Sequence, residues 1–292
     1  MTEIRSTDRL TAAEAAGVLA LAAAAETADG VYPLSEDVVL RARGGGDPAT
    51  QRHYLAYQDN ELAGYAFVED ASGELFVHPA HRRRGHGTAL LAAAGDGPLR
   101  FWAHGDEAGA RAFAEKSGFD RVRVLWQMRR SLLEPLPDVP LPAGVTVRGF
   151  RPGADEESWL AVNARAFAHH PEQGRWTLDD LLLREGEPWF DPAGFLLAVD
   201  IEDTLLGYHW TKVHSASGDD PALGEIYVLG IDPSGHRRGL GAALSVAGLR
   251  HLAAQGLTVS NLYVDESNAA AVALYRRLGF EIYKTDVSYQ RH

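Results

Sequence analysis

Two side chains in the second half of the chain could move protons. Glu225 lies eight residues before Pro233, and Tyr275 lies four residues before Gly279. A carboxylate held in position can act as a general base, and a phenol can act as a general acid. Pro233 cannot continue a strand, and Gly279 is of the type that closes helices. We therefore expect Glu225 to open a strand and Tyr275 to lie in the last turn of a helix.

The residues after Pro233 could bind a phosphate. Residues 225–231 are mostly β-branched and aromatic, which predicts a strand that Pro233 ends. Gly239 and Gly241 permit a tight turn whose N–H groups point inward. Residues 242–254 have a helical pattern, and the N-terminus of a helix offers unpaired N–H groups and a partial positive charge.

The same stretch occurs earlier in the chain. Pro79 and Pro233 are 154 positions apart, and so are Gly85 and Gly239. Both copies run from a strand through a glycine-containing turn into a helix. The repeat predicts two halves of similar fold, related by duplication.

The two copies differ in the groups that could move protons. Ala71 stands eight residues before Pro79, and Ala114 stands four residues before Gly118. The first half therefore keeps the phosphate-binding pattern but lacks both candidate acid–base groups. This difference predicts that the first half binds a ligand without turning it over, and that the second half is catalytic.

The surrounding sequence predicts the elements that position these groups. Residues 131–142 hold four of the fourteen prolines, which is typical of a linker. We expect domains at 1–130 and 144–292, with the linker at 131–143. The pattern predicts helices at 11–28, 35–43, 107–116, 156–167, 177–184, 242–254 and 268–278, and one that follows the first glycine turn and runs through residue 94. It predicts strands at 53–57, 62–68, 74–77, 98–103, 119–129, 145–148, 195–199, 205–213, 225–231, 259–264 and 281–289.

Composition excludes several classes of protein. The net charge of −12 argues against a general nucleic-acid binder. The chain has no cysteine, so disulfides, thiolate metal sites and a cysteine nucleophile are excluded. The first ten residues do not resemble a signal peptide, and the alanine-rich segment 12–25 is too weakly apolar to span a membrane. These features predict a soluble cytoplasmic protein.

The combined pattern resembles the GNAT acetyltransferases. It consists of a strand, R-x-x-G-x-G at a helix start, and a later segment with an L-Y-V strand and a Y-x-x-x-G-F helix end. The resemblance covers nearly the whole chain, twice. It implies an α/β (α+β) fold of two tandem GNAT domains, each a mixed, mostly antiparallel sheet flanked by helices. His236 departs from the usual Gln or Arg, although histidine can also donate to a phosphate oxygen.

Four longer strings resemble the mycothiol synthase family within the GNAT proteins. They are 169–174, 189–192, 208–214 and 224–230, and they are rich in Trp and His. In that family an acetyl group passes from acetyl-CoA to the cysteinyl amine of a cysteinyl-glucosaminyl-inositol, the last step of mycothiol biosynthesis. The resemblance implies the same reaction here, in a monomer without a metal.

The resemblance implies acetyl-CoA contacts at the strand ends, at both turns and at a later helix start. In the first half these residues are Leu75, Phe76, Val77, Arg83, Arg84, Gly85, His86, Gly87 and Thr88. In the second half they are Leu229, Gly230, Ile231, His236, Arg237, Arg238, Gly239, Leu240, Gly241, Ala242, Asn268, Ala269, Ala270, Ala271, Val272 and Ala273.

Roles in the reaction follow from the chemistry of acyl transfer to an amine. Glu225 is the candidate base for the amine, directly or through water, and Tyr275 is the candidate proton donor to the departing thiolate. N–H groups of a splayed strand at 229–231 could stabilise the oxyanion. The resemblance implies acceptor contacts from Glu36, Glu172, Lys212, Glu225 and Tyr263. Glu36 lies in the first half, which would require an acceptor cleft shared by both halves.

Simpler interpretations stay open for each of these residues. Glu225 could be a solvated residue at a strand end, and Tyr275 could be a core aromatic. Tyr263 could also be structural, and Glu36 at a helix start could be a surface carboxylate favoured by the helix dipole.

Charged and histidine-rich strings also have simpler interpretations. The run 82–84 could be a solvated cluster of arginines or a nucleic-acid contact, but its place before Gly85 favours a phosphate. Glu172 follows His169 and His170, but adjacent histidines chelate a metal poorly, so a metal site is not expected.

Other functions would use much of the same pattern. The chain could acetylate another small polar amine, such as an aminoglycoside, or a protein N-terminus. Both halves could also sense acyl-CoA without catalysis, although retention of Glu225 and Tyr275 in one half argues against that function.

Overall fold

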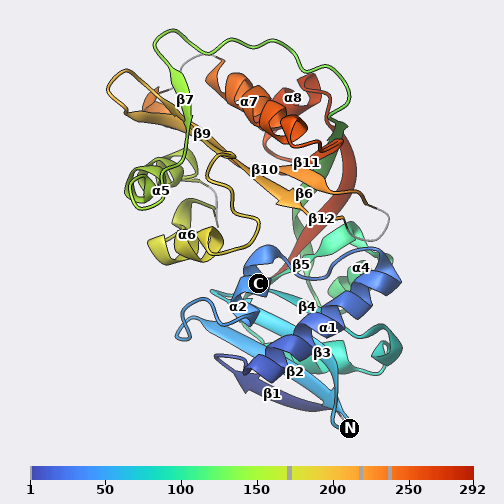
Figure 1. The fold of residues 1–292 in the computed structure, drawn as a ribbon. Coiled ribbons are helices and arrows are strands. Elements are labelled where there is room, and N and C mark those ends of the chain that lie inside the picture. Colours follow the sequence, from blue (N-terminus) through green and yellow to red (C-terminus); the bar gives the residue numbers. More distant parts are fainter. Residues whose placement is uncertain (1, 170–172, 217–219, 236–238) are drawn as a thin grey trace. The chain divides into compact units, whose positions relative to one another are not determined.

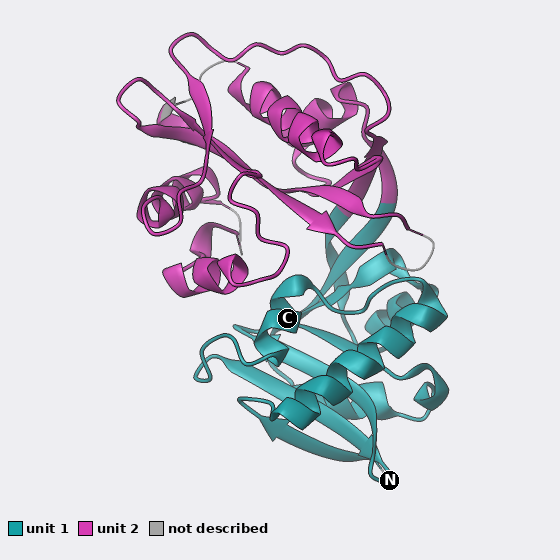
Figure 2. Ribbon diagram, viewed as in Figure 1, with its two compact units in different colours: residues 1–125, 284–292 teal, residues 126–283 magenta. Residues whose placement is uncertain are grey.

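The computed structural model describes residues 2–169, 173–216, 220–235 and 239–292. It divides into two compact units: residues 1–125 with 284–292, and residues 126–283 (Figure 2). Each unit combines strands with helices, as the predicted two-domain α/β fold requires. The predicted helices and strands are confirmed to within a few residues.

The first unit begins with a strand that the sequence did not predict. Strand β1 (Glu3–Thr7) pairs antiparallel with β2 along its whole length. The elements that follow are α1 (Ala12–Asp29), α2 (Glu36–Ala42), β2 (Gln51–Gln58), β3 (Glu61–Glu69), β4 (Ser72–Val77), α3 (His86–Ala94), β5 (Leu99–Ala103), α4 (Ala108–Lys116) and the start of β6 (Asp120–Ser131) (Figure 1).

The sheet of the first unit has helices on both faces. Its strand order is β1-β2-β3-β4-β5-β12, with antiparallel pairs except for the parallel pair β4–β5. Helix α1 packs its buried Val18 against Tyr65 and Phe67 of β3. Leu90 of α3 packs with Ala66 from the opposite face of the same strand. The alternation of side chains along β3 therefore supplies two cores.

The second unit contains the other elements. They are the end of β6, then β7 (Thr146–Gly149), α5 (Glu156–Ala166), α6 (Leu178–Glu185), β8 (Phe195–Val199), β9 (Leu205–His214), β10 (Leu223–Ile231), α7 (Leu240–Ala254), β11 (Val259–Asp265), α8 (Ala269–Arg277) and the first residues of β12 (Glu281–Arg291). Residues 132–145, which include most of the predicted linker, form no helix or strand.

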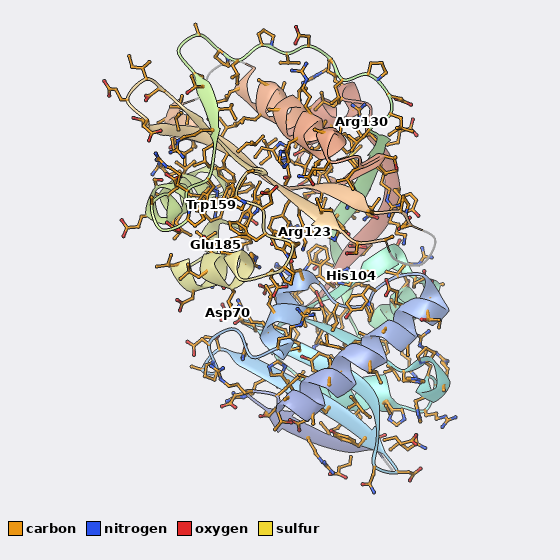
Figure 3. All side chains as sticks on the ribbon, in the orientation of Figure 1. Asp70, His104, Arg123, Arg130, Trp159 and Glu185 are labelled. Carbon is orange, nitrogen blue, oxygen red and sulfur yellow. The ribbon has the colours of Figure 1, made fainter. Side chains whose placement is uncertain are left out.

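The sheet of the second unit also has two helical layers. Its order is β6-β11-β10-β9-β8-β7, with β10–β11 parallel. Helix α7 packs against β8, β9 and β10, and α5 packs against β9 and β10. On the α5 face lies the fully buried Trp159, which is labelled in Figure 3. Its ring meets those of Tyr208 and Trp210 edge-on, with centroids 5.2 and 5.7 Å away.

The C-terminal strand belongs to both units. Residues 281–283 of β12 lie in the second unit, whereas residues from 284 onward complete the sheet of the first. Val287 pairs with Ala103 of β5, and Arg291 pairs with Leu99. The sequence predicted this strand but not its partner.

No helix within the described ranges is long and apolar enough to cross a membrane.

Candidate active site

Glu225 lies in the middle of the sheet of the second unit. It stands opposite Lys212 of β9 on one side and Asn261 of β11 on the other. Residues in register on neighbouring strands project to the same face. The three polar side chains therefore form a row across three strands, and each is at least nine-tenths buried.

This row faces the layer that contains α5. His209 of β9 bonds to the Leu244 carbonyl of α7, so it points to the other face. Tyr208 donates to Asn163 of α5 at 2.6 Å. Lys212 shares the parity of Tyr208 along the strand and therefore its face. Lys212, Glu225 and Asn261 thus lie on the α5 face of the sheet, and α7, the helix that follows the glycine turn, covers the other face.

Strand β10 separates from β11 beyond Glu225. Their parallel pairing ends at Ile226 and Leu262, whereas β10 stays paired with β9 up to Ile231. The ladder with β9 is interrupted between Ile226 and Val228, which indicates a β-bulge at Tyr227. The predicted splay of this strand is therefore present.

The splay leaves backbone groups of β10 turned away from β9. The Asp232 N–H donates to Leu206 at 2.9 Å, so it points toward β9. Successive residues of a strand direct their N–H groups to opposite sides. The N–H groups of Ile231 and Leu229 therefore point to the side from which β11 has departed. These N–H groups belong to the stretch that the sequence predicts as oxyanion donors.

Glu225 is paired with a histidine that the sequence did not single out. Its Oε2 lies 2.5 Å from Nε2 of His214, the last residue of β9. The carboxylate side chain is 7% exposed and the imidazole is 37% exposed. Glu225 is therefore a buried carboxylate in contact with a partly exposed imidazole, not the solvated strand-end residue of the simpler interpretation.

Tyr275 lies near the end of α8, as predicted, and is buried in the core. Its ring packs edge-on against Phe280 with centroids 5.9 Å apart, and it belongs to the cluster around Leu262 and Val264. Burial raises the pKa of its phenol well above the ordinary value. The phenol is thus neutral at physiological pH and is both a core residue and a possible proton donor.

The predicted acceptor residues lie in different surroundings. Lys212 extends over the rings of Trp189 and Tyr227, with its Nζ 4.3 and 5.1 Å from the ring centroids. Tyr263 is 45% exposed, and its hydroxyl accepts a bond of 3.1 Å from the amide of Gln127.

The other two predicted acceptor residues are placed less fully. Glu36 is the first residue of α2 in the first unit, where its partly exposed carboxylate suits the helix N-terminus. Glu172 lies outside the described residues.

The two predicted phosphate turns have the same backbone. Gly239 precedes α7 with φ 92° and ψ −7°, and Gly85 precedes α3 with φ 92° and ψ −2°. This left-handed region suits glycine, which explains its presence at both positions. Leu240 is buried beneath the turn, whereas Gly241 and Ala242 are half-buried. His236, Arg237 and Arg238 lie outside the described residues.

The start of α8 presents a surface of small residues. Asn268 caps the helix by accepting a bond of 3.1 Å from the Ala271 N–H. Val272 points into the core. The remaining predicted contacts, Ala269, Ala270 and Ala273, are exposed small side chains over which a ligand could lie.

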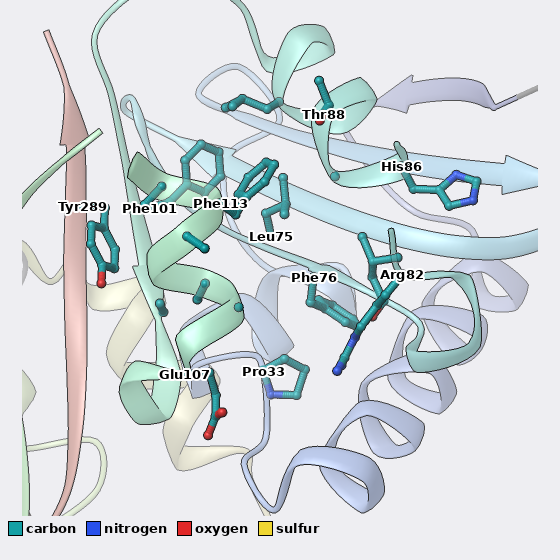
Figure 4. A pocket seen from close by; sticks show the side chains of 18 of the residues that line it. Pro33, Leu75, Phe76, Arg82, His86, Thr88, Phe101, Glu107, Phe113 and Tyr289 are labelled. Atoms are coloured by element: carbon teal, nitrogen blue, oxygen red, sulfur yellow. The ribbon is translucent and has the colours of Figure 1, made fainter. Parts of the chain in front are cut away.

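The first unit contains a cavity of about 500 Å³ (Figure 4). It lies at the splay and turn of the first copy. It is lined by the predicted residues Leu75, Phe76, Val77, Arg83, Gly85, His86, Gly87 and Thr88, but not by Arg84. Arg82, which the prediction omitted, also lines it and pairs with Asp29 at 2.5 Å.

The first unit repeats the splay of the second. Parallel pairing of β4 and β5 ends at Glu74 and Trp102. The His78 N–H donates to Ala63 of β3 at 2.9 Å, so the Val77 N–H points to the opposite side, toward the gap. The cavity therefore follows the edge of β4 toward which the Val77 N–H points, and it ends at the glycine turn.

A buried charged network includes one residue that lines this cavity. This residue, His104, is labelled in Figure 3 and lies 3.1 Å from Asp286 and 3.3 Å from Glu74. Burial by itself lowers the pKa of His104, but the two carboxylates outweigh burial and raise the pKa to about 10. Asp286 also accepts the Gly105 N–H, and Glu74 accepts the Ser35 N–H, each at 2.8 Å.

Sequence reasoning missed His214 and the network around His104. One signal for His214 was present, because the strand ending in Lys212-Val213-His214 precedes the Glu225 strand and alternation puts His214 on the face of Lys212. No local signal links His104 with Asp286, which are 182 positions apart.

Two sheets with a splayed parallel pair, each followed by a glycine turn into a helix, define a tandem GNAT fold. The GNAT family model matches residues 157–280, and a GNAT domain model matches residues 49–121. A tandem GNAT protein from the clavulanic acid biosynthesis pathway superposes with a TM-score of 0.76 at 21% identity, covering 100% of this chain and 98% of that one. A GCN5-related N-acetyltransferase from Sphaerobacter thermophilus gives a TM-score of 0.67 at 27% identity, covering 99% and 95%.

Relatives of higher sequence identity define the family within the GNAT proteins. The mycothiol acetyltransferase of Salinispora arenicola is 55% identical over 99% of this chain and 96% of its own length. That of Thermobispora bispora is 54% identical over 99% of both chains. The chain belongs to the mycothiol acetyltransferase family and is an N-acetyltransferase.

Proposed function

We propose that the chain transfers the acetyl group of acetyl-CoA to the cysteinyl amine of 1D-myo-inositol 2-(L-cysteinylamino)-2-deoxy-glucopyranoside (desacetylmycothiol), the final step of mycothiol biosynthesis. The observation that carries the proposal is that Glu225 is a buried carboxylate just before the point where its strand splays from β11. The relatives that are named for this activity match the chain over nearly their full length. We further propose a cytoplasmic monomer that needs no metal, nucleic acid or membrane.

Glu225 makes the amine reactive. The acceptor amine is an ammonium ion at neutral pH, and its nitrogen attacks only after losing a proton. Glu225 takes that proton, directly or through water. The new C–N bond then forms as the C–S bond of the thioester breaks.

Backbone and phenol groups stabilise the charges that develop. The N–H groups of Leu229 and Ile231 point into the splay, where they can bond to the oxyanion. Tyr275 is protonated at neutral pH, as an ordinary phenol is, and burial raises its pKa further, so it holds a proton for the departing thiolate. The start of α7 at Leu240 offers N–H groups for the pyrophosphate of CoA.

We assign the acceptor contacts to Glu36, Glu172, Lys212, Glu225 and Tyr263. Carboxylates, an ammonium and a phenol suit an acceptor rich in hydroxyls and an amine. The aromatic rings of Trp189 and Tyr227 support the part of Lys212 in this assignment, because they contact its Nζ on the face of the sheet that contains Glu225.

We assign a second acetyl-CoA site to the first unit, without turnover. Its cavity follows a splayed strand edge to a turn with the geometry of Gly239. Ala71 replaces the carboxylate of the second copy, and the ring nitrogens of His104 both face carboxylates, so this imidazole is not available as a base. We propose 1–130 and 144–292 as the repeated domains, joined by 131–143.

The acceptor is tested by measuring release of free CoA with desacetylmycothiol, an aminoglycoside and a peptide in parallel. We expect turnover with the first of these. Absence of turnover with it, and turnover with either of the others, would reject the acceptor while keeping the acetyltransferase class.

The roles of the two halves are tested with a matched pair of variants. Added side chains at Gly241 and Gly87 would begin 3.8 Å from Ile231 and 3.5 Å from Phe113, so both positions accept a β-carbon but lie where a bulky ring would obstruct the turn. Gly241→Trp should abolish turnover, and Gly87→Trp should lower the number of CoA molecules bound per chain without abolishing turnover. The reverse result would reassign catalysis to the first unit.

A further inference from the structure

We propose that His214 is a positioning and proton-relay residue for Glu225, which receives the proton that the carboxylate removes from the amine and passes it to water. The inference rests on the proposed role of Glu225 as the base. It adds a residue and a proton route to that role.

The strand register fixes the pair. Glu225 stands opposite Lys212, and His214 lies two residues further along β9 on the same face. Oε2 of Glu225 and Nε2 of His214 are 2.5 Å apart. Because both residues belong to paired strands, the contact is held by the sheet and not by two mobile side chains. His214 itself stands opposite Leu223, the first residue of β10.

The two partners differ in their access to water. The Glu225 side chain is 7% exposed, and that of His214 is 37% exposed. A buried carboxylic acid must lose its proton before the next turnover, and its neighbour is the group through which the proton can leave. Imidazole suits this step because its two nitrogens can accept and release protons on different sides.

The proposed sequence conserves protons. The ammonium gives one proton to the Glu225 carboxylate. The resulting acid gives it to Nε2 of the His214 tautomer that carries its own proton on Nδ1, and the imidazolium then releases the Nδ1 proton to water. Glu225 ends as a carboxylate and His214 as a neutral imidazole, whose tautomers exchange through solvent between turnovers.

Other charged groups on this face will influence the pH dependence. Lys212 lies on β9 itself, and Tyr227 lies on β10. From β11, Tyr263 shares the face of Asn261 and bonds to Gln127 of β6. Two residues further along β6, Arg129 forms a pair with Asp220 at 2.6 Å. These groups remain unchanged in the variants described below.

The relay can be separated from a purely orienting hydrogen bond. His214→Gln keeps an N–H donor for the Glu225 carboxylate but cannot take up a proton. His214→Ala removes both functions and leaves space for imidazole from the buffer. We expect both variants to lower kcat by roughly 10- to 100-fold with little change in KM, since general acid–base groups contribute at least that much.

Buffer rescue gives the distinguishing readout. Imidazole should raise kcat of His214→Ala in a saturable manner and should not rescue His214→Gln. The acid limb of the wild-type pH profile of kcat should change in both variants. A His214→Gln enzyme with wild-type kcat and pH profile would reduce His214 to an orienting residue and overturn the proposal, whether or not His214→Ala folds.

Two further variants separate this proposal from the one on which it rests. His251 of α7 also contacts a carboxylate, Asp191 at 3.2 Å, but it lies on the helix that covers the opposite face. His251→Gln should therefore leave kcat unchanged. Glu225→Gln should be nearly inactive. An active Glu225→Gln enzyme would remove both proposals, whereas an inactive one beside a fully active His214→Gln enzyme would remove the relay alone.

Discussion

Alanine at Gly239 should weaken acetyl-CoA binding through backbone strain alone. The residue has φ +92°, and a β-carbon added there would meet no atom within 4 Å. Gly85 in the first unit has the same φ and the same open surroundings. Gly256, after the end of α7, has φ +84° and is also open, so it serves as a control away from both turns.

The expected magnitude follows from the cost of left-handed backbone. An L-residue with a side chain pays about 1–2 kcal/mol there. In Gly239→Ala the turn can relieve this strain by moving, and ligand binding must then restore the strained form. At about 1.4 kcal/mol per tenfold change, KM for acetyl-CoA should rise by roughly 5- to 30-fold. In Gly256→Ala the same strain should appear as reduced stability, with KM unchanged.

Steady-state kinetics and ligand counting test these expectations together. Gly85→Ala should leave kcat and KM near wild type and should weaken one class of bound CoA, measured by equilibrium dialysis. Unfolding midpoints of all three variants report the strain itself. A wild-type KM in Gly239→Ala, in a preparation where Gly256→Ala is measurably destabilised, would refute the assignment of this turn to CoA.

Three further predictions concern single buried groups. Tyr275→Phe should keep the fold, because the ring still packs on Phe280, and should lower kcat; unchanged kcat would leave Tyr275 a core residue. Burial lowers the pKa of His209 to about 4, so its stabilising contribution is present above pH ~6.5 and is lost as pH falls through about 4. Urea titrations should show that loss, up to about 3 kcal/mol, in the wild type and a flatter acid profile in His209→Gln. The pKa of His104 is raised to about 10, so its contribution is full below pH ~6.5 and is lost as pH rises through about 10. His104→Gln should show less alkaline loss than the wild type, and equal loss in both would contradict this account.

Local signals were sufficient for most helices and strands. Thr11 and Glu14 predicted the start of the first helix, and the structure has both reciprocal bonds of the capping box there. Gly239 marked a turn because few other residues adopt its backbone conformation. β1 was missed because its short sequence, Glu3–Thr7, is polar and exposed, so pairing with β2 and not a hydrophobic pattern makes it a strand.

In the candidate site, too, some features follow from local sequence and others depend on strand pairing. The repeat and the glycine turns follow from the order of residues along the chain, and so does the presence of Glu225 and Tyr275 in the second half alone. The contact between Glu225 and His214 depends on strand register, because a shift by one residue would put them on opposite faces.

The sequence by itself determined two α/β halves and their glycine turns, and it showed which half contains Glu225 and Tyr275. The halves and turns depend on the conformational limits of residues close together in the chain. Tertiary structure alone decided that Val287 of the last strand pairs with Ala103 of the first unit, and that His104 meets Asp286. Such contacts join residues far apart in the chain, and their free energy exists only once the whole sheet has formed.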